Sequence, residues 1–194
     1  KNMIVTGNDV RVLDSLIGAI KHFADINHKT VHMNILGSPD KLNVCAESQY
    51  FKVALYQDVD SQIEALENTN VTDGYRVNLL IEPDSCEEFT QSPGGLRKSK
   101  GAEVLKSALI NSENMFSIVY SKNFKNIRTS LQYIVNAAPV HIVSVGDYEN
   151  VRMSMSENVR LTSCDFDVPR KDSIKAYYYN KETEKYGKMI MFLP

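Results

Sequence analysis

The sequence predicts an α+β protein in which one building block, a strand followed by a helix and three further strands (β-α-β-β-β), occurs twice. Hydrophobic residues recur at helical spacing in two stretches, which begin near Val10 and near Phe124. Each stretch follows a short apolar run and precedes runs typical of strands. The fold we expect is a repeat of these units, with antiparallel sheets and the helices on one face.

The composition is that of a globular protein with a substantial core. The chain has 194 residues, of which 43% are hydrophobic. No run approaches the roughly 20 apolar residues that cross a bilayer, and the first residues lack the apolar stretch of a secretory signal. The cysteines Cys45, Cys86 and Cys164 are far apart in the sequence and form no CxxC pair. We therefore expect a soluble protein in a reducing, intracellular compartment, nuclear or cytoplasmic, without a disulfide framework.

The first unit begins with an apolar run at 3–5 and a turn at 7–9. A helix is expected from about Val10 to Asp25, because apolar side chains recur every three or four residues. Antiparallel strands are then expected at 31–36, 42–47 and 50–56. The alternation of apolar and polar residues in the second of these strands is typical of a sheet with one wet face.

The middle of the chain is less regular. A short helix is expected at 59–66, a strand at 76–81 and a helix at 102–110. Between them, residues 82–101 are rich in Pro, Ser, Gly and charge, which is typical of a loop or linker. We therefore place a first unit at 1–112, which contains this loop-rich segment, and a second unit at 113–194; the alternative is one continuous domain.

The second unit repeats the order of the first. A strand at 116–120 precedes a helix capped by Ser121, and this helix ends at Ala138-Pro139, since a residue before proline avoids helical dihedral angles. Further strands are expected at 140–145, 151–156 and 159–166, and a closing hairpin at 174–179 and 188–194.

This order resembles the DNA sliding clamp superfamily, which includes the proliferating cell nuclear antigen, the phage clamps and the checkpoint clamp subunits. The resemblance is carried by MIVTGNDVRVLDSLIGAIKHFADI, by FSIVYSKNFKNIRTSLQYIVN with VHIVSVGDYENVRMSMS, and by a terminal hairpin ending in MFLP. Residues 57–114 depart from the clamp pattern. The resemblance implies a non-enzymatic subunit that forms a ring with itself or with other clamp subunits. Such a subunit tethers partner proteins on double-stranded DNA without a cofactor.

A clamp needs a basic lining that meets phosphates regardless of sequence. The net charge of this chain is -2, so a surface that binds DNA must be local. The residues expected to contact DNA are Lys122, Lys125, Arg128, Arg11 and Lys21. The first three are spaced by three residues and share one helical stripe. The alternative is that they form an ordinary solvated helix face.

A partner-binding surface is expected at the tyrosine run Tyr177, Tyr178 and Tyr179. In a strand, the outer two of these side chains lie on one face and the middle one on the other, so that one face packs and the other meets a partner. The alternative function is a protein-interaction or structural module, such as a viral or assembly component, with no role on nucleic acid. Its contact surface would be the tyrosine hairpin or the 82–101 loop.

No catalytic or metal-binding signature is recognisable. The basic segment GGLRKSKG at 94–101 does not match the phosphate-binding pattern GxxxxGK[ST], which argues against nucleotide hydrolysis. The four histidines form no HExxH pair, which argues against zinc. From the sequence we therefore expect no enzyme activity, no cofactor and no metal.

Overall fold

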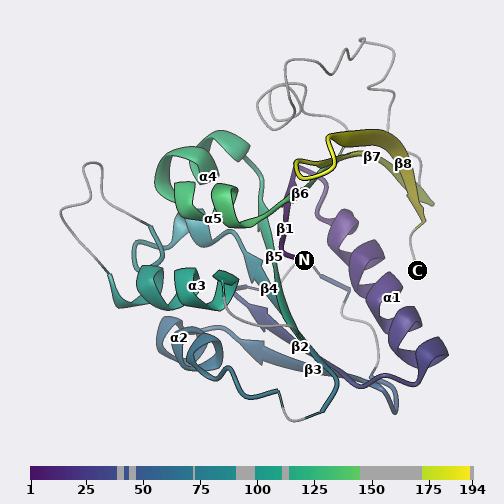
Figure 1. The fold of residues 1–194 in the computed structure, drawn as a ribbon, viewed down its shortest axis with the longest axis horizontal. Helices are drawn as coiled ribbons and strands as arrows, with labels where there is room; N and C mark the ends of the chain where they lie inside the picture. The colour runs from purple at the N-terminus through teal and green to yellow at the C-terminus, as the bar shows by residue number, and fades with distance from the viewer. Residues whose placement is uncertain are drawn as a thin grey trace.

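The computed structural model describes residues 1–38, 42–43, 47–71, 73–90, 99–110, 114–144 and 172–192. Their strands form one eight-stranded sheet in the order β3-β2-β4-β5-β1-β6-β7-β8 (Figure 1). The strands are β1 (Met3–Thr6), β2 (Val31–Leu36), β3 (Phe51–Tyr56), β4 (Tyr75–Ile81), β5 (Met115–Ser121), β6 (Val140–Ser144), β7 (Ser173–Asn180) and β8 (Lys185–Phe192). Pairings among β1 to β6 are parallel, and β7 and β8 add an antiparallel hairpin at one edge.

Helices cover both faces of the sheet, because parallel strands need crossover connections. The helices are α1 (Arg11–Asn27), α2 (Val59–Glu67), the 3-10 turn η1 (Pro83–Ser85), α3 (Lys100–Ile110), α4 (Phe124–Ser130) and α5 (Gln132–Ala137). Figure 1 shows α1 alone on one side of the sheet and α2 to α5 on the other. The architecture is therefore a three-layer, doubly wound α/β sheet.

Two hydrophobic cores hold the layers together. Val12, Leu13 and Ile17 of α1 pack on one face of the sheet. Leu105 of α3 and Ile127 of α4 belong to the core on the other face. Neighbouring strand residues supply both cores, since successive side chains point to opposite faces. The central strands are covered on both faces, and their sequences therefore contain apolar runs such as LLI in β4.

The expectation of a mixed helix and strand protein is confirmed, but the antiparallel sheet expected for the N-terminal strands is wrong. β2 and β3 are parallel, with Val31 opposite Phe51 and Leu36 opposite Tyr56. Residues 42–43 lie in no strand, and 44–46 are outside the described residues. β2 and β3 pair directly, so the strand expected at 42–47 does not lie between them in the sheet. β2 pairs instead with β4 on its other side, which leaves β3 at the edge.

The predicted placement of the two long helices on a common face is also wrong. α1 belongs to one core, whereas α4 and α5 belong to the other. The second helix is moreover broken at Leu131, whose dihedral angles are not helical, and its N-cap is Asn123 rather than Ser121. Within the described residues, α1 and the pair α4–α5 therefore do not form the common helix lining that a clamp requires.

The sheet contains strands from both sides of the boundary proposed at 112 and 113, and β1 lies between β5 and β6. The boundary itself stays a prediction. The strands expected at 151–156 and 159–166 lie outside the described residues. None of the helices in the described part of the chain is both long and apolar enough to cross a membrane.

A buried amide pair fixes the contact between β2 and β4. Asn34 Nδ2 donates to Asn78 Oδ1 over 3.0 Å, and both side chains are buried. We predict that Asn34→Ala lowers the free energy of unfolding by about 1–3 kcal/mol, because it leaves the Asn78 carbonyl oxygen buried without this donor. Urea denaturation measures the change. The exposed-site control Asn27→Ala should cost less than about 0.5 kcal/mol, and equal losses for both variants would contradict the prediction.

Candidate functional site

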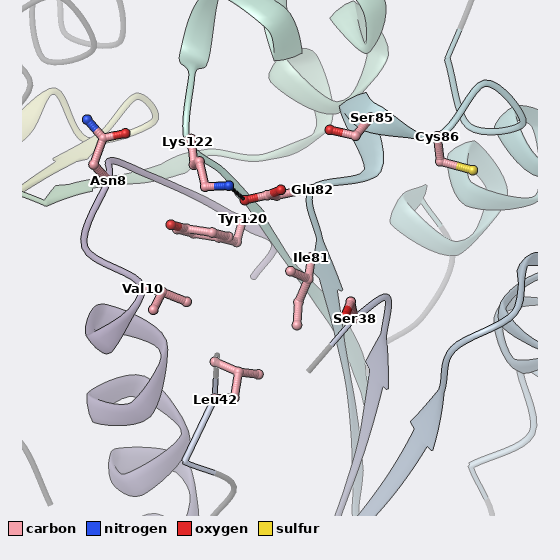
Figure 2. A pocket seen from close by; sticks show the side chains of 10 residues that line it. All are labelled: Asn8, Val10, Ser38, Leu42, Ile81, Glu82, Ser85, Cys86, Tyr120 and Lys122. Carbon is pink, nitrogen blue, oxygen red and sulfur yellow. Dashed lines mark ion pairs between the residues drawn. The ribbon is translucent and has the colours of Figure 1, made fainter. Parts of the chain in front are cut away.

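The carboxyl ends of β1, β4 and β5 meet at one edge of the sheet. β1 continues into α1 on one face, and its neighbour β5 continues into α4 on the other. Where adjacent parallel strands send their connections to opposite faces, a crevice opens that commonly binds ligands. A cavity of about 440 Å³ lies here (Figure 2). Its walls come from the β1–α1 loop, the ends of β4 and β5, η1 and the β2–β3 connection.

The β1–α1 loop is fixed in place at its first residue. Gly7 has φ 129°, and a Cβ added there would overlap Ser144 Oγ, so only glycine fits. The Tyr120 hydroxyl donates to the Gly7 carbonyl oxygen over 2.9 Å, and Gly7 N donates to Ser121 O over 3.3 Å. Burial raises the pKa of Tyr120 to about 12, so this hydroxyl stays a donor at neutral pH. The loop is therefore anchored on β5 and packed against β6.

The start of α1 already holds a negative charge. Asp9 accepts hydrogen bonds from the Arg11 side chain, Nε at 2.9 Å and Nη2 at 2.7 Å, and from Arg11 N at 3.2 Å. The bond from the Arg11 side chain lowers the pKa of Asp9, so the carboxylate stays ionised at neutral pH. Among the described residues, no hydrogen bond is donated by the main-chain N–H of Asn8, Asp9 or Val10. Successive loop amides of this kind can hold an anion.

An ion pair crosses the middle of the cavity. Lys122, just after β5, contacts Glu82, just after β4, with Nζ and Oε1 2.6 Å apart. Figure 2 shows the two groups meeting between Asn8 on one side and Ser85 and Cys86 on the other. Glu82 has φ 50°, a left-handed conformation that is uncommon without glycine and is found preferentially at functional sites.

A half-buried carboxylate, that of Asp84, lies two residues after Glu82 in the sequence. Asp84 Oδ2 accepts a hydrogen bond of 2.9 Å from Ser121 Oγ, whereas Oδ1 is buried with no hydrogen-bond partner in the described part of the chain. Burial raises the pKa of Asp84, and the bond from Ser121 opposes that shift. No group of three His, Cys, Asp or Glu residues that could hold a metal occurs among the described residues. An oxygen-seeking ion such as Mg²⁺, which often binds through one or two carboxylates and substrate phosphates, needs no such group.

The structure does not gather the predicted DNA-contacting residues on one surface. Lys122 precedes α4 and faces the cavity, whereas Lys125 and Arg128 are exposed on α4. Arg11 is engaged with Asp9, and Lys21 lies half-buried on α1, across the sheet from α4. Their role on DNA stays a prediction.

The tyrosine run lies on β7. Tyr177 is buried, at 3% exposure, while Tyr178 and Tyr179 are half-buried. Partner binding at this run stays a prediction, and the buried Tyr177 gives a partner little to contact.

The sequence gives no motif for Glu82 on the cavity or for the neighbouring Asp84–Ser121 pair. Glu82 and Asp84 were assigned to a loop, and Ser121 to a helix cap. Position in the chain is a usable signal: Glu82 follows directly on β4, Asp84 lies two residues further on, and Ser121 ends β5. In a parallel sheet, residues at the carboxyl ends of strands lie at the ligand-binding edge.

Comparison with protein-family models and with curated proteins gives no match. Solved structures do match. The genome packaging NTPase B204 from Sulfolobus turreted icosahedral virus 2, in complex with ATP-gammaS, is 14% identical, with a TM-score of 0.57 over 99% of this chain and 97% of that one. The DNA-packaging ATPase B204 from Sulfolobus turreted icosahedral virus is 13% identical, with a TM-score of 0.57 over 96% of each chain. The cytoplasmic domain of the Thermomonospora curvata type VII secretion ATPase EccC is 9% identical, with a TM-score of 0.56 over 98% of this chain and 23% of that one.

At these identities the likeness shows the fold, which is that of NTPases and ATPases rather than of sliding clamps. The resemblance to the clamp superfamily is therefore wrong, and so are the ring-forming clamp function and the clamp-subunit partners inferred from it. The alternative, an interaction module without a nucleic-acid role, gains no support either. The expectation of a protein without enzyme activity is overturned as well, because the proteins that share the fold are enzymes acting on nucleotides.

Burial of the Asp84 carboxyl group makes the free energy of unfolding depend on pH in a way that can be tested. With its pKa raised above 3.8, the folded chain keeps this proton to higher pH than the unfolded chain does. The free energy of unfolding therefore loses a contribution as pH rises from about 3.8 through the folded-state pKa. We predict that Asp84→Asn is more stable than the wild type at pH 7, by a margin that shrinks toward pH 4.

Urea denaturation at the two pH values measures this margin. Asp60→Asn, at an exposed position of α2, controls for the loss of one negative charge. A margin for Asp84→Asn that is absent at pH 7, or equal at both pH values, would contradict the prediction.

Proposed function

We propose that this chain binds a nucleoside triphosphate at the carboxyl ends of β1, β4 and β5 and hydrolyses it. The observation that carries the proposal is the Lys122–Glu82 ion pair in a cavity that the unbonded amides of Asn8 and Val10 also line, at the switch point of the sheet. The shared fold with a packaging NTPase that binds ATP-gammaS supports it.

The loop would hold the phosphates. Asn8 and Val10 line the cavity, and Asp9 lies between them in the chain. The main-chain N–H groups of all three donate no hydrogen bond within the described residues, and such amides before a helix bind phosphate oxygens. Mg²⁺, which accompanies a triphosphate, would neutralise phosphate charge when bound, and Glu82 is the carboxylate among the described lining residues that could contact it.

Glu82 is the candidate general base. Its carboxylate lines the cavity and lies after β4, opposite the β1–α1 loop (Figure 2). It would accept a proton from a water molecule that attacks the terminal phosphorus. The new bond joins the water oxygen to the terminal phosphorus, and the bond from this phosphorus to the bridging oxygen breaks. A nucleoside diphosphate and inorganic phosphate then leave.

We predict that the wild-type chain releases phosphate from ATP and that Glu82→Gln slows this release about 100-fold or more without loss of nucleotide binding, because the amide cannot accept the proton. A phosphate-release assay and titration with a fluorescent ATP analogue measure the two effects. Glu64→Gln on exposed α2 is the matched control and should hydrolyse at the wild-type rate. Wild-type chain that neither binds nor hydrolyses a triphosphate, or Glu82→Gln with full activity, would refute the proposal.

We further propose double-stranded DNA as a partner, contacted regardless of sequence. Support comes from two exposed cations three residues apart on α4, Lys125 and Arg128, and from the DNA-packaging role of a protein with this fold. Arg11, Lys21 and Lys122 belong to the same predicted set, but the ion pairs of Arg11 and Lys122 make Lys125 and Arg128 the better candidates.

We predict that the double reversal Lys125→Glu with Arg128→Glu weakens DNA binding and reduces the slope of log affinity against log salt by about 1.8, since two phosphate contacts are lost. Fluorescence anisotropy with a labelled duplex at several salt concentrations gives both values. Lys29→Glu with Lys106→Glu, also exposed, is the charge-matched control. Equal effects of the two double variants would show that net charge alone, and not α4, is responsible.

A further inference from the structure

We propose that Lys122, at the end of β5, supplies the cation that holds the terminal phosphates, in place of the lysine that the β1–α1 loop lacks. The inference rests on the proposed function and deepens it. The site that binds a polyphosphate would then take its basic residue from a neighbouring strand and not from the loop itself.

The loop carries no lysine. In the phosphate-binding pattern GxxxxGK[ST], the lysine before the helix reaches the β- and γ-phosphates. Here the residues from Thr6 to Asp14 read TGNDVRVLD, so the glycine that follows the strand is kept and the GK[ST] end is missing. Backbone amides remain, but amides alone supply no full positive charge against a triphosphate.

Arg11, the basic residue that follows the loop in the sequence, does not replace the missing lysine. Arg11 presents Nε and Nη2 to the two carboxylate oxygens of Asp9, a bidentate pairing that matches the guanidinium fork. The hydrogen bond from Arg11 lowers the pKa of Asp9, so both partners stay charged. The Arg11 charge is thus neutralised at the start of α1 by the residue two positions before it.

Lys122 is placed to take the role. Of the described residues that line the cavity, Lys122 is the basic one and Glu82 the acidic one. Its side chain is 46% exposed, so a ligand entering from solvent can reach the ammonium group. Figure 2 shows that group at the centre of the lining residues, between Glu82 and the side of the cavity that carries Asn8.

The contact with Glu82 makes a specific exchange possible. A triphosphate carries several negative charges and competes with one carboxylate for the Lys122 ammonium. On binding, Nζ passes from Glu82 Oε1 to a phosphate oxygen, and the Glu82 carboxylate loses its cationic partner. Binding therefore works against the Lys122–Glu82 pair, and weakening that pair should favour the ligand.

Two variants with opposite effects test this exchange. Lys122→Ala should lower the affinity for ATP about ten- to hundredfold, the range for loss of a hydrogen bond to a charged group, and should affect AMP much less. Glu82→Gln should raise the affinity for ATP, because its amide no longer holds the ammonium. That gain should vanish when Lys122→Ala is added. Lys122→Arg, which keeps the charge, should retain part of the affinity, and Lys125→Ala on exposed α4 is the matched control.

Titration of each variant with the fluorescent analogues of ATP and AMP separates the possible outcomes, with circular dichroism as the check that each variant is folded. Wild-type chain that binds no ATP overturns the proposed function and this inference with it. Wild-type binding that survives in folded Lys122→Ala overturns the inference alone. Lys122→Ala and Lys122→Arg that are equally weak, or a gain from Glu82→Gln that persists without Lys122, also overturn it.

Discussion

Parallel pairing of β1 with β5 on one side and β6 on the other is the constraint on which the rest of the structure depends. Parallel strands share a direction, so the residues that follow β1, β4 and β5 arrive at the same edge of the sheet. The crossover after β1 runs over one face and the one after β5 over the other, which leaves the edge between them open. Glu82, Asp84, Ser121 and the loop after Gly7 meet there because of this topology.

The same edge concentrates groups that give little stability. The Lys122–Glu82 pair is partly exposed, and such pairs contribute roughly 0–1 kcal/mol. Asp84 lowers stability because burial disfavours its charged form, and Glu82 lowers it because its backbone is left-handed. Stability comes instead from the two cores, in which side chains such as Ile17 and Ile127 are fully covered. Rules of local consistency are typically broken at functional sites, and here they are broken beside the cavity.

Much of the secondary structure was predictable from the sequence. The helix expected from about Val10 to Asp25 is α1, and the strands expected at 31–36 and 76–81 are β2 and β4. Local periodicity reports which residues are buried, and this is enough to recognise an element. It does not report the pairing partner of a strand, so consecutive strands were joined as antiparallel neighbours when they are parallel.

The candidate site was less predictable for the same reason. Glu82 and Ser121 are distant in the sequence and come together only through the pairing of β4 with β5. Lys122 was predicted to bind phosphates, but as part of a helix stripe on DNA; the structure places it before α4, on the cavity. The residues after Gly7 do not match the pattern GxxxxGK[ST], so this loop gives no sequence signal for the fold.

A crystal structure of the chain with a non-hydrolysable ATP analogue and Mg²⁺ tests the central claim most directly. The account predicts phosphate density beside the main-chain N–H groups of Asn8, Asp9 and Val10, with Lys122 Nζ turned from Glu82 to a terminal phosphate oxygen. An analogue bound elsewhere on the molecule, with the Lys122–Glu82 pair intact, would contradict it.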